Sequence, residues 1–188
     1  MNSLLQHQKD RNLISIRRDA IDKNSIQAFV LALSAELVVL QYVYDFNLDG
    51  LMVLRASDIT EVRWSETDRF QRGLLERAGL LQRVPFDATF DLRNWQTIID
   101  QFSYQYKLMI LECEAGDEDI FLIGRVLKST AAGVQVLEFS GAANWEKLPT
   151  EAKFKDVTCC QVGTNYVNFY QRYFDENPLD AALGKSSN

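Results

Sequence analysis

The feature of this sequence that most constrains its fold is an order of patterns that occurs twice. Each occurrence starts with an alternating apolar strand, at residues 37–42 or 134–139, and continues through a turn. It then has a strand that carries Asp-Ile-Thr (58–60) or Asp-Val-Thr (156–158), and it closes with an amphipathic helix. A repeated order of elements indicates a repeated structural unit. We therefore expect two copies of one unit.

The segments upstream of these strands also correspond. Residues 12–33 and 107–128 each read as a strand, a polar turn and a second strand. A chain of 188 residues is long enough for two small domains. We predict a first domain at 1–88 and a second at 89–178, followed by a small, polar tail (179–188) that frays.

Two closing helices and one leading helix, around 92–102, are predicted. Thr164 can cap the last helix, and Ser65 stands in a capping-box relation to Asp68 at the other closing helix. Both closing helices have an apolar stripe, which we interpret as facing a core, although aromatic residues could also stack on bases or on a flat cofactor. The stripes are Phe70, Leu74, Ala78 and Leu81, and Phe169, Tyr170, Tyr173 and Phe174.

Composition limits the partners that the protein can have. Hydrophobic residues make up 47% of the chain and charged residues 24%, so we expect a packed core. The net charge of -6 opposes general attraction to nucleic acid or to anionic lipid, and no DNA or membrane partner is expected. Arginines nevertheless gather near the first closing helix, where mixed signs favour a solvated face with ion pairs. The alternative is a surface for an anionic partner, formed by Arg55, Arg69, Arg72 and Arg77.

Cysteine usage and hydropathy favour a reducing compartment. Cys113, Cys159 and Cys160 lack ligand spacing, and adjacent Cys159 and Cys160 would point to opposite faces of a strand. The sequence has no hydrophobic signal core and no apolar run near the length of a membrane span. A cytoplasmic location is the expectation.

A helix followed by short, strongly bent antiparallel strands resembles the Sm-like small β-barrel. The segments at 123–139 and 52–62 carry the resemblance best, looking like that family's second and third strands and its fourth and fifth strands. The whole chain resembles uncharacterised bacterial proteins that carry two such barrels in tandem. The resemblance implies a mainly β fold with helices (α+β), made of two Sm-like antiparallel β-barrels, each with a helix.

The RNA-binding motifs of the Sm family do not carry over to this chain. Sm proteins bind RNA through an Asp and an Asn before the third strand and an Arg-Gly pair before the fifth. The loops at 34–36 and 129–133 contain neither Asp nor Asn. Arg55 matches the arginine of the second motif, but Ala56 stands where glycine is expected, and the second copy has Lys153-Phe154.

The segment YDFNLDGL resembles part of a calcium loop. Asp45, Asn47, Asp49 and Gly50 occupy positions 1, 3, 5 and 6, but position 12 is Ala56 and not the glutamate that closes such a site. The flanking residues alternate as strands do, and Asp, Asn and Gly also favour turns. We predict a turn between two strands and no metal site.

Catalytic arrangements are equally poorly supported. The only histidine, His7, lies in a polar N-terminal segment, which leaves serine or cysteine nucleophiles without a base and zinc without ligands. No phosphate-binding loop occurs, so no cofactor is expected. Asp58 and Asp156 could form a carboxylate pair that does acid–base work. The simpler interpretation is that each side chain accepts backbone N–H groups at the end of a strand.

The sequence therefore favours a non-catalytic binding or scaffold protein. We expect a protein partner or self-association, because open small barrels can pair their edge strands between subunits. The alternative is an RNA-binding protein that uses a non-standard surface of the first barrel, and an unusual enzyme is a third hypothesis. The join between the units is apolar, so Phe86 and Phe90 are predicted to be mostly buried and to hold the units together as one rigid body.

Overall fold

The computed structural model describes residues 2–114 and 120–178. The predicted tail and the polar turn predicted for the second half lie outside these residues. The strands are β1 (Leu13–Arg18), β2 (Asp22–Leu33), β3 (Leu37–Tyr44), β4 (Asn47–Arg55), β5 (Glu61–Arg63), β6 (Met109–Cys113), β7 (Ile120–Ser129), β8 (Gly133–Glu138), β9 (Thr150–Lys153) and β10 (Cys159–Val162). The helices are α1 (Asn2–Lys9), α2 (Glu66–Arg77), α3 (Trp95–Gln105) and α4 (Asn165–Glu176), with short 3-10 turns η1 (Ala56–Asp58) and η2 (Leu81–Arg83).

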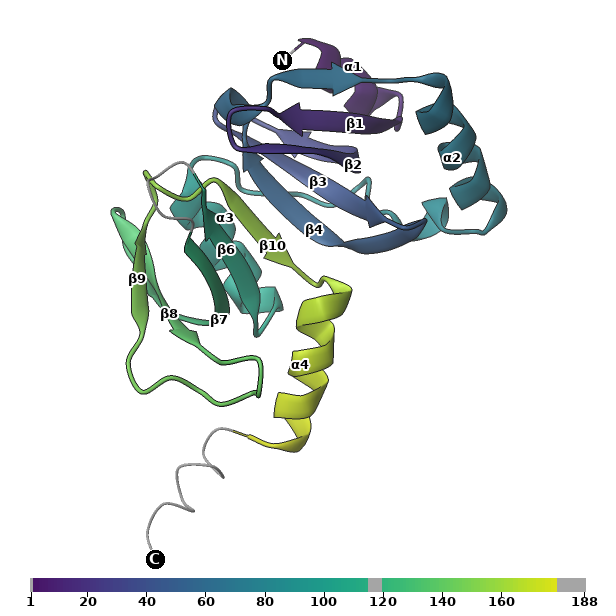
Figure 1. Cartoon of the computed structure of the whole chain (residues 1–188). Helices are drawn as coiled ribbons and strands as arrows, with labels where there is room; N and C mark the ends of the chain where they lie inside the picture. The colour runs from purple at the N-terminus through teal and green to yellow at the C-terminus, as the bar shows by residue number, and fades with distance from the viewer. Residues whose placement is uncertain (1, 115–119, 179–188) are drawn as a thin grey trace, which may run out of the picture.

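All ten strands form one antiparallel sheet in the order β5-β1-β2-β3-β4-β10-β6-β7-β8-β9 (Figure 1). The fold is therefore α+β, as the sequence predicted. The two halves have the same internal order, because the last strand of each pairs with its first strand: β5 with β1, and β10 with β6. A helix precedes the five strands in each half, and another follows them.

The sheet does not form the two closed barrels that the sequence suggested. β4 pairs with β10 from Leu51 to Leu54, and this pairing joins the halves. No strand pairing among the described residues closes either half on itself. The apolar edge of β4 obtains its backbone partners from the other half of the chain, and the result is a single open sheet.

Register shifts at matching places bend the sheet in both halves. The pairing of β2 with β3 shifts between Val30 and Ala32, and the pairing of β7 with β8 shifts between Val126 and Lys128. An extra residue in one strand bends it and increases its twist. The strongly bent strands expected from the sequence are therefore present in the open sheet.

Two threonines make the same hydrogen bonds in the two halves. The Thr60 N–H and hydroxyl donate to the Arg17 carbonyl at 2.8 and 3.1 Å. The Thr158 N–H and hydroxyl donate to the Glu112 carbonyl at 2.8 and 3.0 Å. Each threonine thus holds the turn before the last strand of its half against the first strand.

The aspartates before these threonines do not have the role predicted for them. The Asp58 Oδ1 accepts from the Ser57 hydroxyl at 3.2 Å, and within the described residues no backbone N–H donates to the carboxylate of Asp58 or Asp156. The expectation that these side chains accept backbone N–H groups is wrong, because the threonine side chains make the contacts with the neighbouring strand. The strands that follow the two aspartates, β5 and β10, are separated in the sheet by β1 to β4.

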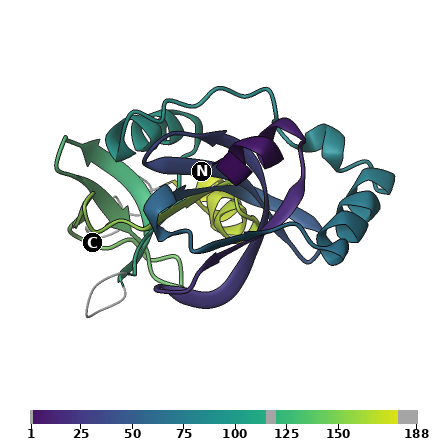
Figure 2. The ribbon, with the colours of Figure 1, turned by 90° about the horizontal axis from the view of Figure 1, so that it is seen from above.

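The largest apolar cluster is continuous across both halves on one face of the sheet. Phe29 and Val53 from the first half share it with Met109 and Val162 from the second, and α3 covers it with the fully buried Phe102. The connection between α2 and α3 runs across the molecule (Figure 2) and packs against the same cluster. The burial of apolar surface therefore couples the two halves.

The two phenylalanines of this connection contact opposite halves. The Phe86 ring meets the Phe29 ring edge-on at 5.6 Å, and the Phe90 ring meets the Phe102 ring at 6.3 Å. Both residues are more buried than exposed and pack against the continuous core, as predicted. Their contacts with the common core agree with the expected joining role.

The opposite face of the sheet has two separate apolar clusters. In the first half, Leu4 of α1 packs over Ile16 and Val30. In the second half, Val167 and Phe174 of α4 are the helix residues that complete the cluster.

Cys159 belongs to the first-half cluster and Cys160 to the continuous core, which agrees with the prediction that they face opposite ways. All three cysteines are buried, and burial raises the pKa of each thiol.

The helix caps predicted from the sequence are confirmed, but the predicted apolar faces are partly wrong. Ser65 and Asp68 form a capping box, and Thr164 accepts from the Val167 N–H. In α2 the buried apolar residue is Leu75, whereas Phe70 is 64% exposed. In α4, Phe169 is 61% exposed. Each helix packs on the sheet along a narrower line than a full apolar stripe would cover.

The segment that resembles a calcium loop is a tight hairpin, as predicted. Asp45 and Phe46 connect β3 to β4 with positive φ angles of 45° and 61°. The Asp49 Oδ1 accepts from the Asn165 N–H at 2.6 Å, so this acid caps the start of α4. Gly50, with a φ of 74°, lies where a Cβ would come within 2.3 Å of the Val162 carbonyl oxygen. Asp49 and Gly50 of β4 therefore hold this strand against the start of α4 in the other half.

Candidate functional site

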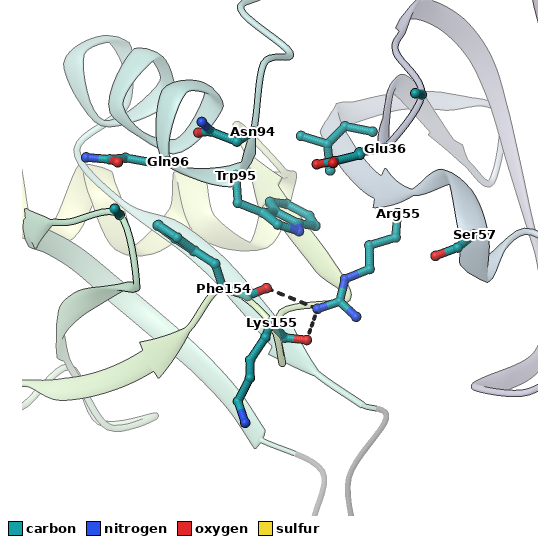
Figure 3. Close-up of a pocket in the computed structure, with 11 residues that line it drawn as sticks. Glu36, Arg55, Ser57, Asn94, Trp95, Gln96, Phe154 and Lys155 are labelled. Carbon is teal, nitrogen blue, oxygen red and sulfur yellow. Dashed lines mark hydrogen bonds between the residues drawn. The ribbon is translucent and has the colours of Figure 1, made fainter.

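The leading candidate is a cleft of about 550 Å³ at the junction of the two halves, which we call the junction cleft. Loops of both halves and the start of α3 form it (Figure 3). Its lining residues are Ala35, Glu36, Leu37, Arg55, Ser57, Asn94, Trp95, Gln96, Ala131, Phe154 and Lys155.

Arg55, the last residue of β4, crosses the junction. Its Nη2 donates to the Phe154 carbonyl at 3.0 Å and also to the Lys155 carbonyl (Figure 3). The guanidinium thereby satisfies two carbonyl groups at the end of β9, which strand pairing leaves open. Its other nitrogens have no partner within the described residues, so they remain able to donate to a ligand. Arg55 thus combines a structural contact with free donors.

The loops on the two sides of the cleft have equivalent backbone bonds. Before β3 and after β4, the Ala56 N–H donates to the Glu36 carbonyl at 2.8 Å. Before β8 and after β9, the Phe154 N–H donates to the Ala132 carbonyl at 3.0 Å. Matching loops therefore fix the walls of the cleft. These are also the loops in which the sequence comparison placed the Sm motifs.

The first turn of α3 supplies the remaining wall. Asn94 caps the helix by accepting from the Thr97 N–H at 3.0 Å, and Thr97 completes the capping box. The Trp95 ring points into the cleft towards Arg55 (Figure 3), although only 8% of the residue is exposed. The small accessible part of this aromatic side chain contributes to the floor of the cleft.

The lining carries one carboxylate, Glu36, and two cationic side chains, Arg55 and Lys155. Glu36 and Arg55 come from the same wall, where Leu37 pairs with Arg55, and the Lys155 side chain points away from Trp95 (Figure 3). The lining contains no histidine or cysteine, and Ser57 donates to Asp58 at 3.2 Å. This combination offers hydrogen-bond donors, acceptors and one aromatic ring, which suits binding and provides no nucleophile with a base.

The four arginines proposed as an anionic-partner surface are divided by the structure. Arg55 lies in the junction cleft, whereas Arg69, Arg72 and Arg77 lie on α2, which contributes no lining residue. The Arg69 guanidinium stacks over Trp64 at 5.1 Å. Arg72 pairs with Glu76 at 3.3 Å, the i,i+4 ion pair expected of a solvated helix face.

Most of the cleft was not identified from the sequence as a site. Arg55 was named as a site residue. The repeat pattern could also have drawn attention to Glu36, in the loop that matches the loop of Ala132, and to Phe154, which matches Ala56. Trp95 and Asn94 had no such signal, because only the three-dimensional fold brings the start of α3 beside β4. His7 lies on α1 with its Nδ1 at 3.2 Å from the Asn12 amide nitrogen, outside the cleft.

Within residues 2–114 and 120–178, no three His, Cys, Asp or Glu side chains are grouped so that they could hold a metal ion. None of the helices in the described part of the chain is long and apolar enough to cross a membrane. Comparisons of this chain with models of protein families, with curated proteins and with solved structures find no match.

Proposed function

We propose that this protein is a non-catalytic binding protein that holds a segment of a protein partner in the junction cleft. The observation that carries the proposal is the construction of the cleft from matching loops of both halves. Arg55 and Glu36 present a donor and an acceptor from the first-half wall of the cleft, beside Trp95. A polypeptide segment carries both kinds of group along its backbone and fits this balance. The protein would act in the cytoplasm, where its cysteines stay reduced.

We also propose that each half is an Sm-like module and that the chain is a tandem pair of such modules. In support, each half has a leading helix and the same order of five strands. The register shifts in β2 and β7 fall at corresponding places. The pairing of β4 with β10 would then replace the closure of each barrel by a junction within the chain.

A partner of a different kind is favoured over a second copy of the chain. The free edges of the sheet are β5 and β9, which are three and four residues long. Glu61 and Arg63 on β5, and Glu151 and Lys153 on β9, place charges on these edges. Short, charged edges resist pairing with another sheet. Self-association through edge strands is therefore the less supported form of scaffold.

RNA is the second candidate ligand. The loops that line the cleft are those that the resemblance to Sm proteins equates with their RNA-binding loops, and Arg55 matches the arginine of their second motif in that resemblance. Against this, the lining has only two cations, Arg55 and Lys155, and one carboxylate, Glu36, whereas RNA binding depends on a larger excess of positive charge. A protein segment remains the leading proposal.

Site-specific crosslinking in cells that make the protein distinguishes these ligands. Ala131 and Ser57 line the cleft and are exposed, so each can be replaced by the photoreactive p-benzoylphenylalanine. Arg77, which is exposed on α2, is the matched control. We expect an adduct at positions 131 and 57 that ribonuclease leaves unchanged and in which mass spectrometry finds peptides of a partner protein. An adduct removed by ribonuclease would support the RNA alternative. No adduct, or the same adduct at position 77, would contradict binding in the cleft.

A further inference from the structure

A second cavity lies on the face of the sheet that has two separate apolar clusters. Between these clusters, where β10 pairs with β6, the chain places polar side chains and not apolar ones. Glu112 of β6 and Gln161 of β10 occupy this strip, and the residue after β6, Glu114, meets Arg18 at the end of β1. Apolar residues would join the clusters and stabilise the sheet more, so polar groups here point to a function.

The cavity over this strip has a volume of about 600 Å³, and we call it the seam cavity. It shares no lining residue with the junction cleft. Four carboxylates from three segments of the chain line it: Asp22, Asp45, and Glu112 with Glu114. Arg18 is the one cationic side chain in the lining.

Arg18 is already paired. Its Nη1 and Nη2 donate to the two carboxylate oxygens of Glu114 at 2.8 and 3.1 Å, and its side chain is only 5% exposed. Its Nε, also buried, has no acceptor within the described residues. In a bidentate pair of this kind, the positive charge of the arginine and the negative charge of the glutamate neutralise each other. The remaining lining therefore carries uncompensated negative charge.

Glu112 is the deepest of the remaining carboxylates. The Gln161 side-chain amide donates to its Oε1, and no cation pairs with it in the described part of the chain. Burial raises the pKa of Glu112, and the neighbouring Glu114 raises it further. A cationic ligand beside this group would relieve both effects.

Two aromatic rings form another part of the lining. Tyr42 and Tyr44 lie with their ring centroids 6.2 Å apart, and Tyr44 is 58% exposed. Tyrosine faces attract ammonium and guanidinium groups. The carboxylates are not grouped as metal ligands within the described residues. Spaced carboxylates beside aromatic rings match an organic cation, whose N–H groups point in several directions.

We propose that the seam cavity binds an organic cation, a primary ammonium or a guanidinium group, between Glu112, Asp45 and the ring of Tyr42. The cation comes either from a free amine or from a lysine or arginine side chain of a polypeptide. This site is independent of the junction cleft and of the ligand proposed there.

Methyl NMR of the full chain provides the test. The chain has three methionines, of which Met52 lines the seam cavity and Met109 lies in the continuous core as an internal reference. The probes are agmatine and a peptide of alternating glycine and arginine. The control probe is the same peptide with citrulline, which is neutral, in place of arginine. We expect a saturable shift of the Met52 signal, with the Met109 signal unchanged.

Three variants identify the groups that bind the probe. Glu112→Gln and Asp45→Asn should each weaken binding about tenfold, because each removes one charge-assisted contact. Asn tolerates the positive φ of position 45, so the second variant keeps the hairpin if the first affects folding. Glu146→Gln, an exposed position outside the cavity, should bind as the unaltered protein does.

The outcomes also separate the two sources of the cation. A shift with agmatine alone supports a free amine, and a shift with the arginine peptide alone supports a side chain of a polypeptide. The proposal is overturned if neither probe shifts the Met52 signal or if the citrulline peptide shifts it equally. Unchanged affinity in both Glu112→Gln and Asp45→Asn would overturn it as well.

Discussion

At the scale of single residues, the least favourable charge lies in the seam between the two halves. Arg18 and Glu114 come from opposite halves and pair with little exposure to solvent. Buried ion pairs contribute little net stability, because the charges lose their hydration. Glu112 lies beside this pair without a cation of its own among the described residues, and the raised pKa of its carboxyl reflects that position.

The pH dependence of the free energy of unfolding should show that the ionised Glu112 carboxylate destabilises the folded state. A carboxyl whose pKa is raised in the folded state binds its proton more tightly there than in the unfolded chain, so its ionisation opposes folding. Its stabilising contribution is complete below the ordinary pKa of 4.5 and is lost as the pH rises through the raised value. We expect Glu112→Gln to raise the melting temperature at neutral pH by about 2 °C or more.

The matched measurement below the ordinary pKa should show no gain, because Glu112 is then protonated in both states. Thermal unfolding followed by circular dichroism at both pH values checks this, with Glu146→Gln as the exposed control. An equal gain at both pH values would mean that the substitution acts through packing and not through charge.

At the scale of elements, the contact between β4 of the first half and the start of α4 in the second half holds the halves together. Asp49 caps α4, and Gly50 allows the two backbones to approach. The turn and both helix caps could be predicted because they depend on local chemistry, such as Asp, Asn and Gly with positive φ, or Ser and Thr before a helix. The buried faces of α2 and α4 could not, because the position of the sheet decides whether Phe70 or Leu75 is covered.

Two glycine substitutions with opposite expected effects on the free energy of unfolding test this contact. Gly50→Ala would place a Cβ 2.3 Å from the Val162 carbonyl oxygen and 2.6 Å from the Thr164 nitrogen, at a φ of 74°. We expect it to lower the free energy of unfolding by about 2 kcal/mol or more. Gly73→Ala in α2, where an added Cβ would meet nothing within 4 Å beyond the backbone of its own helix and its chain neighbours, should raise it by about 0.5 kcal/mol. Urea titration of both variants measures these values, and a neutral Gly50→Ala would show that the backbones are not in contact.

At the scale of the whole molecule, the sequence predicted the contents of each half better than the way in which the halves combine. Alternating strands, capped helices and the shared order of elements have local patterns. The pairing of β4 with β10 joins residues about a hundred positions apart, and no periodicity reports it. For the same reason Arg55 could be named as a site residue, whereas Trp95 beside it could not.

The central claim is that one sheet and one continuous core unite the two halves into a single cooperative body. Native-state hydrogen exchange of the full chain, measured at increasing urea concentration, tests it most directly. We expect the protected amides of β3, β6 and β10 to reach the same opening free energy, with the same dependence on urea. Protection lost in β6 and β10 at a urea concentration where β3 remains closed would contradict the account.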